Sequence, residues 1–72
     1  MTFIDVRPDL TEGRDPYPRI METVEKLSPE ETLELMTPIE PIPLYRVMEA
    51  RGFEHETRRV DESYWHVTFR RV

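Results

Sequence analysis

The chain has 72 residues, no cysteine, and 15 acidic residues against 10 basic ones, which gives a formal net charge of −5. This length suffices for a single domain, residues 1–72, with a thin core, because a short chain buries a small share of its surface. The missing cysteine excludes disulfides, thiol catalysis and thiolate metal sites. The acidic balance argues against nucleic-acid binding, which depends largely on neutralising phosphates.

The distribution of charged and apolar residues bears on location and source. Residues 1–36 carry nine acidic and four basic side chains, whereas residues 37–72 carry six of each. No apolar run approaches the roughly 18 residues of a membrane span, and the first residues lack the pattern of a signal peptide. We therefore expect a cytoplasmic protein that enters no membrane. Asn and Gln are absent and nine of the ten bases are Arg, which is typical of thermophile proteins and of high-GC genomes.

The first predicted elements are a strand and a loop. Residues 2–7 alternate, with Ile4 and Val6 on one face, which predicts a half-buried strand. Residues 8–15 are expected to form a loop, because Pro8 ends the strand and Gly13 is free to adopt positive φ.

A helix is predicted over residues 16–27, where apolar side chains recur at helical spacing: Tyr17, Ile20, Val24 and Leu27. Asp15 is suited to cap this helix, and Pro16 to its first position, where a missing N–H costs nothing. Pro18 still lies in the first turn, whose N–H groups also lack intrahelical partners.

The next segments repeat this order. Residues 28–31 predict a polar connection, and residues 32–37 a strand with Leu33 and Leu35 pointing inward. Residues 38–52 predict a second helix, in which prolines crowd the start and Gly52 follows the end as a C′ residue. Its apolar stripe consists of Leu44, Val47 and Met48.

Residues 53–60 and 64–71 flank a short turn, residues 61–63, and predict an antiparallel hairpin. If Val60 faces Tyr64, one face pairs Arg58 with His66, Glu56 with Thr68 and Glu54 with Arg70, which gives complementary charges. The other face suits a core and carries Phe53, His55, Trp65, Val67 and Phe69. We therefore expect Trp65 to anchor the core.

The predicted fold class is α+β, a two-layer sandwich of order β-α-β-α-β-β. Right-handed crossovers place both helices on one face of the sheet. The other face is then open to water and shows Phe3, Asp5, Glu34, Met36, Tyr64, His66 and Arg70. A contiguous apolar patch there, from Phe3, Met36 and Tyr64 beside His66, would be an interaction face for a protein partner or a second copy.

The two helix starts carry the motifs of a known family. The whole chain resembles the TusA/SirA-like sulfur carriers, whose first helix opens with Cys-Pro-x-Pro, and Asp15-Pro16-Tyr17-Pro18 aligns with that motif. The segment LSPEETLEL at 27–35 resembles the family's Leu-x-Pro-Gly-Glu connection, with Glu30 in place of the usual glycine. The resemblance implies a four-stranded mixed sheet of order 1-2-4-3, with strand 4 antiparallel to the others.

The second helix start resembles an uncharacterised branch of these proteins that lacks the cysteine. Pro41-Ile42-Pro43-Leu44 matches the Pro-x-Pro-Leu of that branch, but Ile39 and Glu40 stand where the branch often has a His. Relatives of the branch occur alone or fused to other domains, haemerythrin-like ones among them. A sulfur carrier needs a thiolate, so a carboxylate at position 15 can cap the helix but cannot carry sulfur.

Three functional hypotheses follow. The first is a non-catalytic interaction or accessory module without catalytic residues, cofactor or metal. The second is a small-molecule-binding protein or enzyme that uses acidic residues at the helix starts, Asp15 and Glu40. The third is a metal-binding accessory domain in redox metabolism, for which a carboxylate beside His66 on the open face would serve. His55 and His66 are expected on opposite faces of the hairpin, so they cannot bind one ion.

Overall fold

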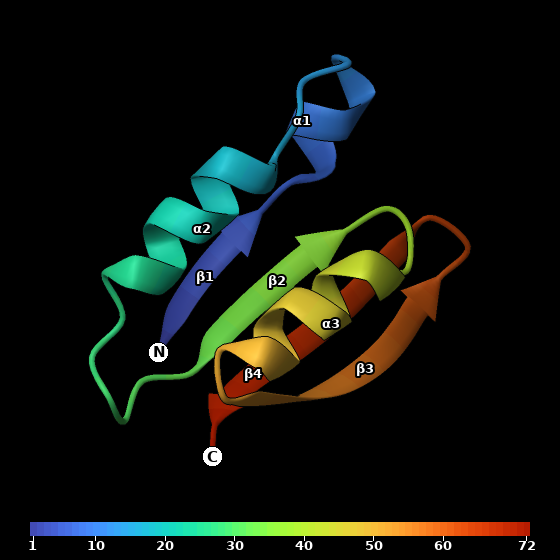
Figure 1. Cartoon of the computed structure of the whole chain (residues 1–72). Coiled ribbons are helices and arrows are strands. Elements are labelled where there is room, and N and C mark those ends of the chain that lie inside the picture. Colours follow the sequence, from blue (N-terminus) through green and yellow to red (C-terminus); the bar gives the residue numbers. More distant parts are fainter.

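A four-stranded sheet with helices against one face forms the structure, a computed structural model that describes residues 1–72 (Figure 1). The sheet order is β1-β2-β4-β3, with β1 parallel to β2, and with β4 antiparallel to both of its neighbours. This confirms the predicted fold class and sheet order, and the predicted element order holds except for one additional short helix after β1. The strands and longer helices are β1 (Thr2–Asp5), α2 (Tyr17–Glu25), β2 (Leu33–Thr37), α3 (Ile42–Ala50), β3 (Phe53–Asp61) and β4 (Tyr64–Arg71).

The segment after β1 differs from the predicted loop over residues 8–15. Arg7–Thr11 forms a short helix, α1, in which Pro8 lies in the first turn instead of ending the strand. Proline suits that turn because its first N–H groups have no partner within a helix. A long-range contact also holds α1, since the carboxylate of buried Asp9 accepts a hydrogen bond from Arg19 of α2 at 2.8 Å.

The two longer helices have the predicted signals at their ends but fewer residues. Asp15 lies two residues before the first residue of α2, and its carboxylate accepts a hydrogen bond from the N–H of Tyr17 at 3.0 Å. The N-cap position itself belongs to Pro16, which was predicted as the first helical residue, so Asp15 acts one position earlier than expected. Gly13 and Gly52 have positive φ angles of 75° and 87°, as expected for a turn and for a helix C′ residue. No helix is long and apolar enough to cross a membrane.

The hairpin register is confirmed over most of its length. Arg58 faces His66, Glu56 faces Thr68, and Glu54 faces Arg70. The expected pair of Val60 and Tyr64 is wrong: Asp61 faces Tyr64, and the ladder shifts between Arg59 and Asp61. A bulge at this place accommodates one extra residue in β3 next to the turn.

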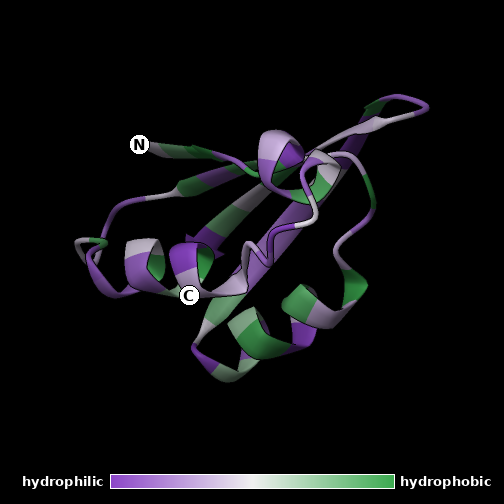
Figure 2. Cartoon of the chain, turned by 90° about the horizontal axis from the view of Figure 1, so that it is seen from above, coloured by the Kyte–Doolittle hydropathy of each residue, from purple (hydrophilic) through white to green (hydrophobic).

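A single apolar cluster fills the space between the sheet and the helices. Figure 2 views the chain from above, with α2 and α3 on the same side of the sheet. The cluster consists of Ile4, Val6, Ile20, Val24, Leu27, Leu33, Leu35, Leu44, Met48, Phe53, Val67 and Phe69. It contains most of the predicted core and joins all the strands to both longer helices.

Two side chains on the hairpin face that was predicted to belong to the core lie outside the core. Trp65 is only partly buried and has the Arg59 guanidinium 5.3 Å from its ring centre. Its cross-strand neighbour is Thr37, the last residue of β2, so Trp65 lies where the helix layer ends. His55 is exposed and stacks on Tyr45 of α3, with ring centres 3.9 Å apart. Tyr17, the first member of the apolar spacing predicted for the first helix, is 45% exposed.

Candidate functional site

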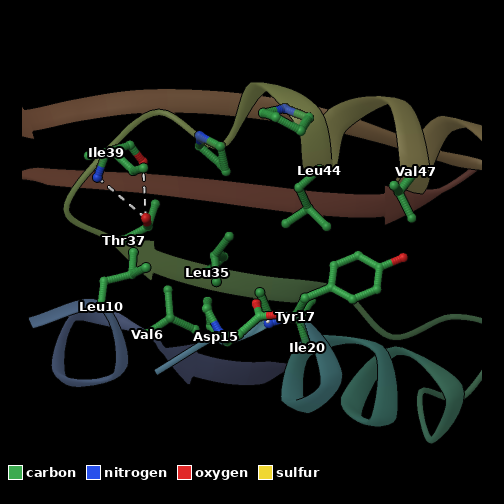
Figure 3. A pocket seen from close by; sticks show the side chains of 13 residues that line it. Val6, Leu10, Asp15, Tyr17, Ile20, Leu35, Thr37, Ile39, Leu44 and Val47 are labelled. Atoms are coloured by element: carbon green, nitrogen blue, oxygen red, sulfur yellow. Dashed lines mark hydrogen bonds between the residues drawn. The ribbon is translucent and has the colours of Figure 1, made fainter. Parts of the chain in front are cut away.

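A cleft of about 300 Å³ opens between α2 and α3. The strand β2 runs between the two helices in Figure 1, and its residues Leu35 and Thr37 line the cleft. In Figure 3, Leu44 and Val47 of α3 point toward Tyr17 of α2, so side chains from three elements meet around one space. Residues of the segments that precede the two helices complete the lining, among them Asp15, Ile39 and Pro41.

Both acid-Pro-x-Pro motifs lie at this cleft. The lining includes Asp15, Pro16 and Tyr17 from the first motif and Pro41, Pro43 and Leu44 from the second. The structure therefore brings together two segments that are 25 residues apart in the sequence (positions 15 and 40). Pro18 and Glu40 do not line the cleft. The Glu40 carboxylate instead accepts a hydrogen bond from the hydroxyl of Tyr45 at 3.3 Å.

The cleft is mainly apolar. Val6, Leu10, Ile20 and Ile39 complete its aliphatic lining. The Thr37 hydroxyl is already engaged, because it donates to the Ile39 carbonyl at 3.0 Å and accepts from the Ile39 N–H at 3.4 Å. Asp15 is the only lining residue with a charged side chain. Such a site can hold an apolar group by removing it from water.

The second hypothesis from the sequence placed a small-molecule site at the helix starts, with Asp15 and Glu40, but sequence analysis did not predict an apolar cleft there. The sequence signal that could have revealed it is the repeated acid-Pro-x-Pro start of both helices, which sit on one face of the sheet. Two helix starts at the same end of parallel strands must lie close together. The repeat alone does not predict the distance between the two helices. That distance determines whether side chains fill the space between the helices or leave a cleft.

The open face of the sheet carries a polar cluster instead of a contiguous apolar patch. Glu34 is 7% exposed, and its carboxylate accepts a hydrogen bond from the Thr68 hydroxyl at 3.0 Å. His66 Nε2 lies 2.8 Å from the same Glu34 oxygen but is poorly aligned with it, because this nitrogen has no hydrogen-bond partner of acceptable geometry. Arg58 lies 3.1 Å from His66 Nδ1. These four residues and Glu56 surround a hollow of about 250 Å³.

The three apolar residues predicted to form an interaction face are separated by polar neighbours. Phe3 is 61% exposed and pairs across the strands with Glu34. Met36 is partly buried between Asp5 and His66. Tyr64 is also partly buried, with the Arg7 guanidinium 4.3 Å from its ring centre. An interaction at this face stays a prediction.

The two histidines lie on opposite faces, as predicted. His55 stacks on Tyr45 of α3, whereas His66 contacts Glu34 on the open face. The structure thus brings together the carboxylate and His66 that the metal hypothesis requires. No group of three or more His, Cys, Asp or Glu side chains is placed to hold a metal ion.

Local contacts shift the pKa of several side chains. The Arg7 guanidinium donates to the Asp5 carboxylate at 2.9 and 3.0 Å and lowers the pKa of that carboxyl. The Thr2 hydroxyl, followed by the Ser28 N–H, lowers the pKa of Glu31. Burial raises the pKa of Tyr45, whose hydroxyl also contacts Thr57. All these groups lie outside the cleft.

The fold and the cleft define a small two-layer α+β domain with an apolar site at its helix starts. The family of uncharacterized conserved proteins designated DUF2249 matches residues 3–71, and the chain belongs to this family. Comparisons with curated proteins and with solved structures found no match.

Proposed function

We propose that this domain is a non-catalytic binding module of the TusA/SirA-like fold, which takes an apolar side chain of a protein partner into the cleft between α2 and α3. The observation that supports this proposal is the cleft itself, an opening of about 300 Å³ with a mainly aliphatic lining. Apolar side chains seated in such openings dominate the binding energy of many protein interfaces.

The size of the cleft favours a side chain over a large ligand. Sites for drug-sized molecules span roughly 300–1,000 Å³, so this cleft is at the lower end of that range. A single large apolar side chain fits the volume, and the rest of its segment would lie across the exposed rim. Tyr17 and Ile39, which are 45% and 60% exposed, provide apolar surface at that rim.

The chemistry of the cleft supports a role without catalysis. The chain has no cysteine, and Asp15 occupies the position that corresponds to the cysteine of the sulfur carriers it resembles. The carboxylate of Asp15 is engaged by the N–H of Tyr17, and no histidine, lysine or second carboxylate lines the cleft. General acid–base catalysis requires a group within reach of a transferable proton and suited to exchange it. A cytoplasmic location and a thermophilic source stay predictions from composition.

The proposal is tested by titrating the labelled protein with indole, a neutral probe the size of a large apolar side chain, and following amide shifts by NMR. We expect the largest shifts around Leu35, Leu44 and Val47, because these residues line the cleft. Shifts confined to other parts of the molecule, or none at millimolar indole, would contradict the proposal.

A matched pair of substitutions sharpens the test. Ile39 and Ile42 are both exposed, at 60% and 53%, but only Ile39 lines the cleft. Ile39→Asp should weaken indole binding at least about tenfold, because it places a charge beside the apolar site. Ile42→Asp should leave the dissociation constant within about twofold. Equal effects of the two substitutions would mean that indole binds elsewhere.

A further inference from the structure

The strand β3 has one unpaired edge. The sheet order places β3 outermost, with β4 as its only neighbour. It has nine residues, contains no proline or glycine, and its side chains are largely exposed. An edge of this kind presents unpaired N–H and C=O groups that can pair with another strand.

One hydrogen bond identifies which backbone groups face outward. The N–H of Val72 donates to the carbonyl of Gly52 at 2.8 Å, at the end of the ladder between β3 and β4. Hydrogen-bonded pairs alternate along an antiparallel ladder. Glu54, Glu56 and Arg58 therefore direct their backbone groups toward β4. The intervening residues, His55, Thr57 and Arg59, direct theirs away from the sheet.

We propose that β3 pairs with β3 of a second copy of this chain, antiparallel and around a two-fold axis at Thr57. The two sheets then join into one continuous sheet. Thr57 faces Thr57 of the second copy, and His55 faces Arg59 of the second copy. Each of these facing residues has its N–H and C=O free, so each pair exchanges two backbone hydrogen bonds. The interface lies outside the cleft and does not depend on the proposed function.

The charges of β3 favour this register. With Thr57 on the axis, Glu56 faces Arg58 of the second copy, and the symmetry creates the same pair again. Opposite charges placed directly across neighbouring strands stabilise a sheet, whereas like charges destabilise it. Both side chains lie on the open face, so their ends can meet.

The neighbouring registers are less favourable. A shift of the axis to Glu56 pairs Glu54 with Arg58 of the second copy but also puts two glutamates opposite each other, and a shift to Arg58 puts two arginines opposite each other. A register shift by one residue would turn the second copy over relative to the first. Glu56 would then lie beside residues of the second copy that face its helices. Of these registers, the one centred on Thr57 pairs opposite charges on the open face without placing like charges opposite each other.

Charged residues and bulges also protect edge strands from unwanted pairing. The bulge near Val60 shortens the regular part of β3 at the turn but leaves the ladder from Phe53 to Arg59 intact. Within that ladder the acidic and basic side chains of the open face are arranged in the order that attracts a second copy. In this respect β3 differs from an edge strand whose like charges would prevent pairing with a second copy.

The experiment is sedimentation equilibrium of the full chain and of charge-reversed variants. The wild type should show a concentration-dependent dimer. Arg58→Glu should weaken dimerisation at least about tenfold, because a carboxylate at position 58 would then face Glu56, and Glu56→Arg should do the same. The double variant restores the opposite charges and should dimerise again. An equimolar mixture of the two single variants should form a heterodimer.

Controls separate this interface from a general charge effect. Arg46→Glu makes the same change of charge on an exposed residue of α3 and should leave dimerisation unchanged. Circular dichroism establishes that each variant is folded. A wild type that stays monomeric at millimolar concentration, a dimer unaffected by Arg58→Glu, or a double variant that fails to dimerise while folded overturns the proposal.

Hydrogen exchange on the wild type provides a test without substitutions. The amides of His55, Thr57 and Arg59 should exchange slowly at high protein concentration and rapidly on dilution. The amide of Glu56, which pairs with β4, should be protected at both concentrations. Equal protection of Thr57 at both concentrations, in a sample that sedimentation shows to dimerise, would place the interface elsewhere.

Discussion

The two faces of the sheet differ in what the fold leaves exposed. The face toward the helices is apolar and almost filled, yet the two helices leave a cleft over Leu35 of β2. The other face has no helix, yet it buries Glu34 in contact with Thr68 and His66. The covered face therefore holds the apolar opening and the uncovered face holds an organised polar cluster. Coverage by helices and availability for apolar binding are separate properties.

The comparison is tested most strongly by truncating a buried aromatic side chain on the covered face. Phe69 is 0% exposed, so Phe69→Ala should lower the free energy of unfolding by about 3–5 kcal/mol. Trp65→Ala should cost less, about 1–2 kcal/mol, because the indole is already partly in water. Urea unfolding followed by circular dichroism measures both. Equal losses in the free energy of unfolding would mean that Trp65 belongs to the core, as the sequence predicted.

A smaller loss is expected from the polar cluster of the open face. Glu34→Ala removes the acceptor of the Thr68 hydroxyl and the close neighbour of His66, and should cost about 1–3 kcal/mol. The matched control is Glu54→Ala on the same face, where the exposed carboxylate pairs with Arg70 at 3.3 Å. That change should stay within about 0.5 kcal/mol. If both variants unfold at the same urea concentration, Glu34 is no part of a stabilising cluster.

The hydrogen bond that Asp15 accepts at the start of α2 should contribute about as much as a single hydrogen bond does elsewhere. Asp15→Ala leaves the N–H of Tyr17 without its acceptor, and should lower the free energy of unfolding by about 1 kcal/mol. Asp15→Asn retains an oxygen in the same place and should lose less. An alanine variant as stable as the wild type in urea would show that the carboxylate does not stabilise the helix.

The same position also tests the likeness to the sulfur carriers. In an Asp15→Cys variant, the N-terminus of α2 should favour the thiolate and lower the thiol pKa below the ordinary value of about 8.5. Ser63→Cys, in the exposed hairpin turn, provides a control thiol of ordinary pKa. Alkylation rates across pH measure both. If the thiol at position 15 had a pKa equal to or above that of the control thiol, residue 15 would not correspond to the cysteine of the Cys-Pro-x-Pro motif.

The smallest effect concerns acid stability. The pKa of Asp5 is lowered from 3.8 by Arg7, and that of Glu31 from 4.5 by Thr2. A lowered pKa in the folded state adds stability above the unfolded pKa, and this stability is lost as the pH falls through the folded value. Unfolding at about pH 6 and at about pH 2–3 should therefore differ less in Asp5→Asn and Glu31→Gln than in the wild type. An unchanged difference would contradict the assignment of these two contacts.

Local sequence patterns determined the elements and their order. The alternation around Ile4 and Leu35, the helical spacing of Ile20 and Val24, and the glycine at position 52 act between near neighbours. Such signals are read from a short stretch of chain because the period of a strand or helix repeats within it. The hairpin register was inferred from the short turn and gave the correct pairs from Glu54 to Arg58, although the starting pair of Val60 and Tyr64 was wrong.

Only the tertiary structure decided which faces of these elements are covered by other parts of the chain. The helix α1 is held by the hydrogen bond between Asp9 and Arg19. Trp65 is partly exposed because it lies where the helix layer ends, and Glu34 is buried because a strand lies on each side of it. The cleft depends on the distance between two helices whose starts are 25 residues apart (positions 15 and 40). A repeating pattern gives the face on which a side chain lies. Whether another element covers that face is decided by the lengths and positions of segments distant in the sequence, since burial requires a partner surface.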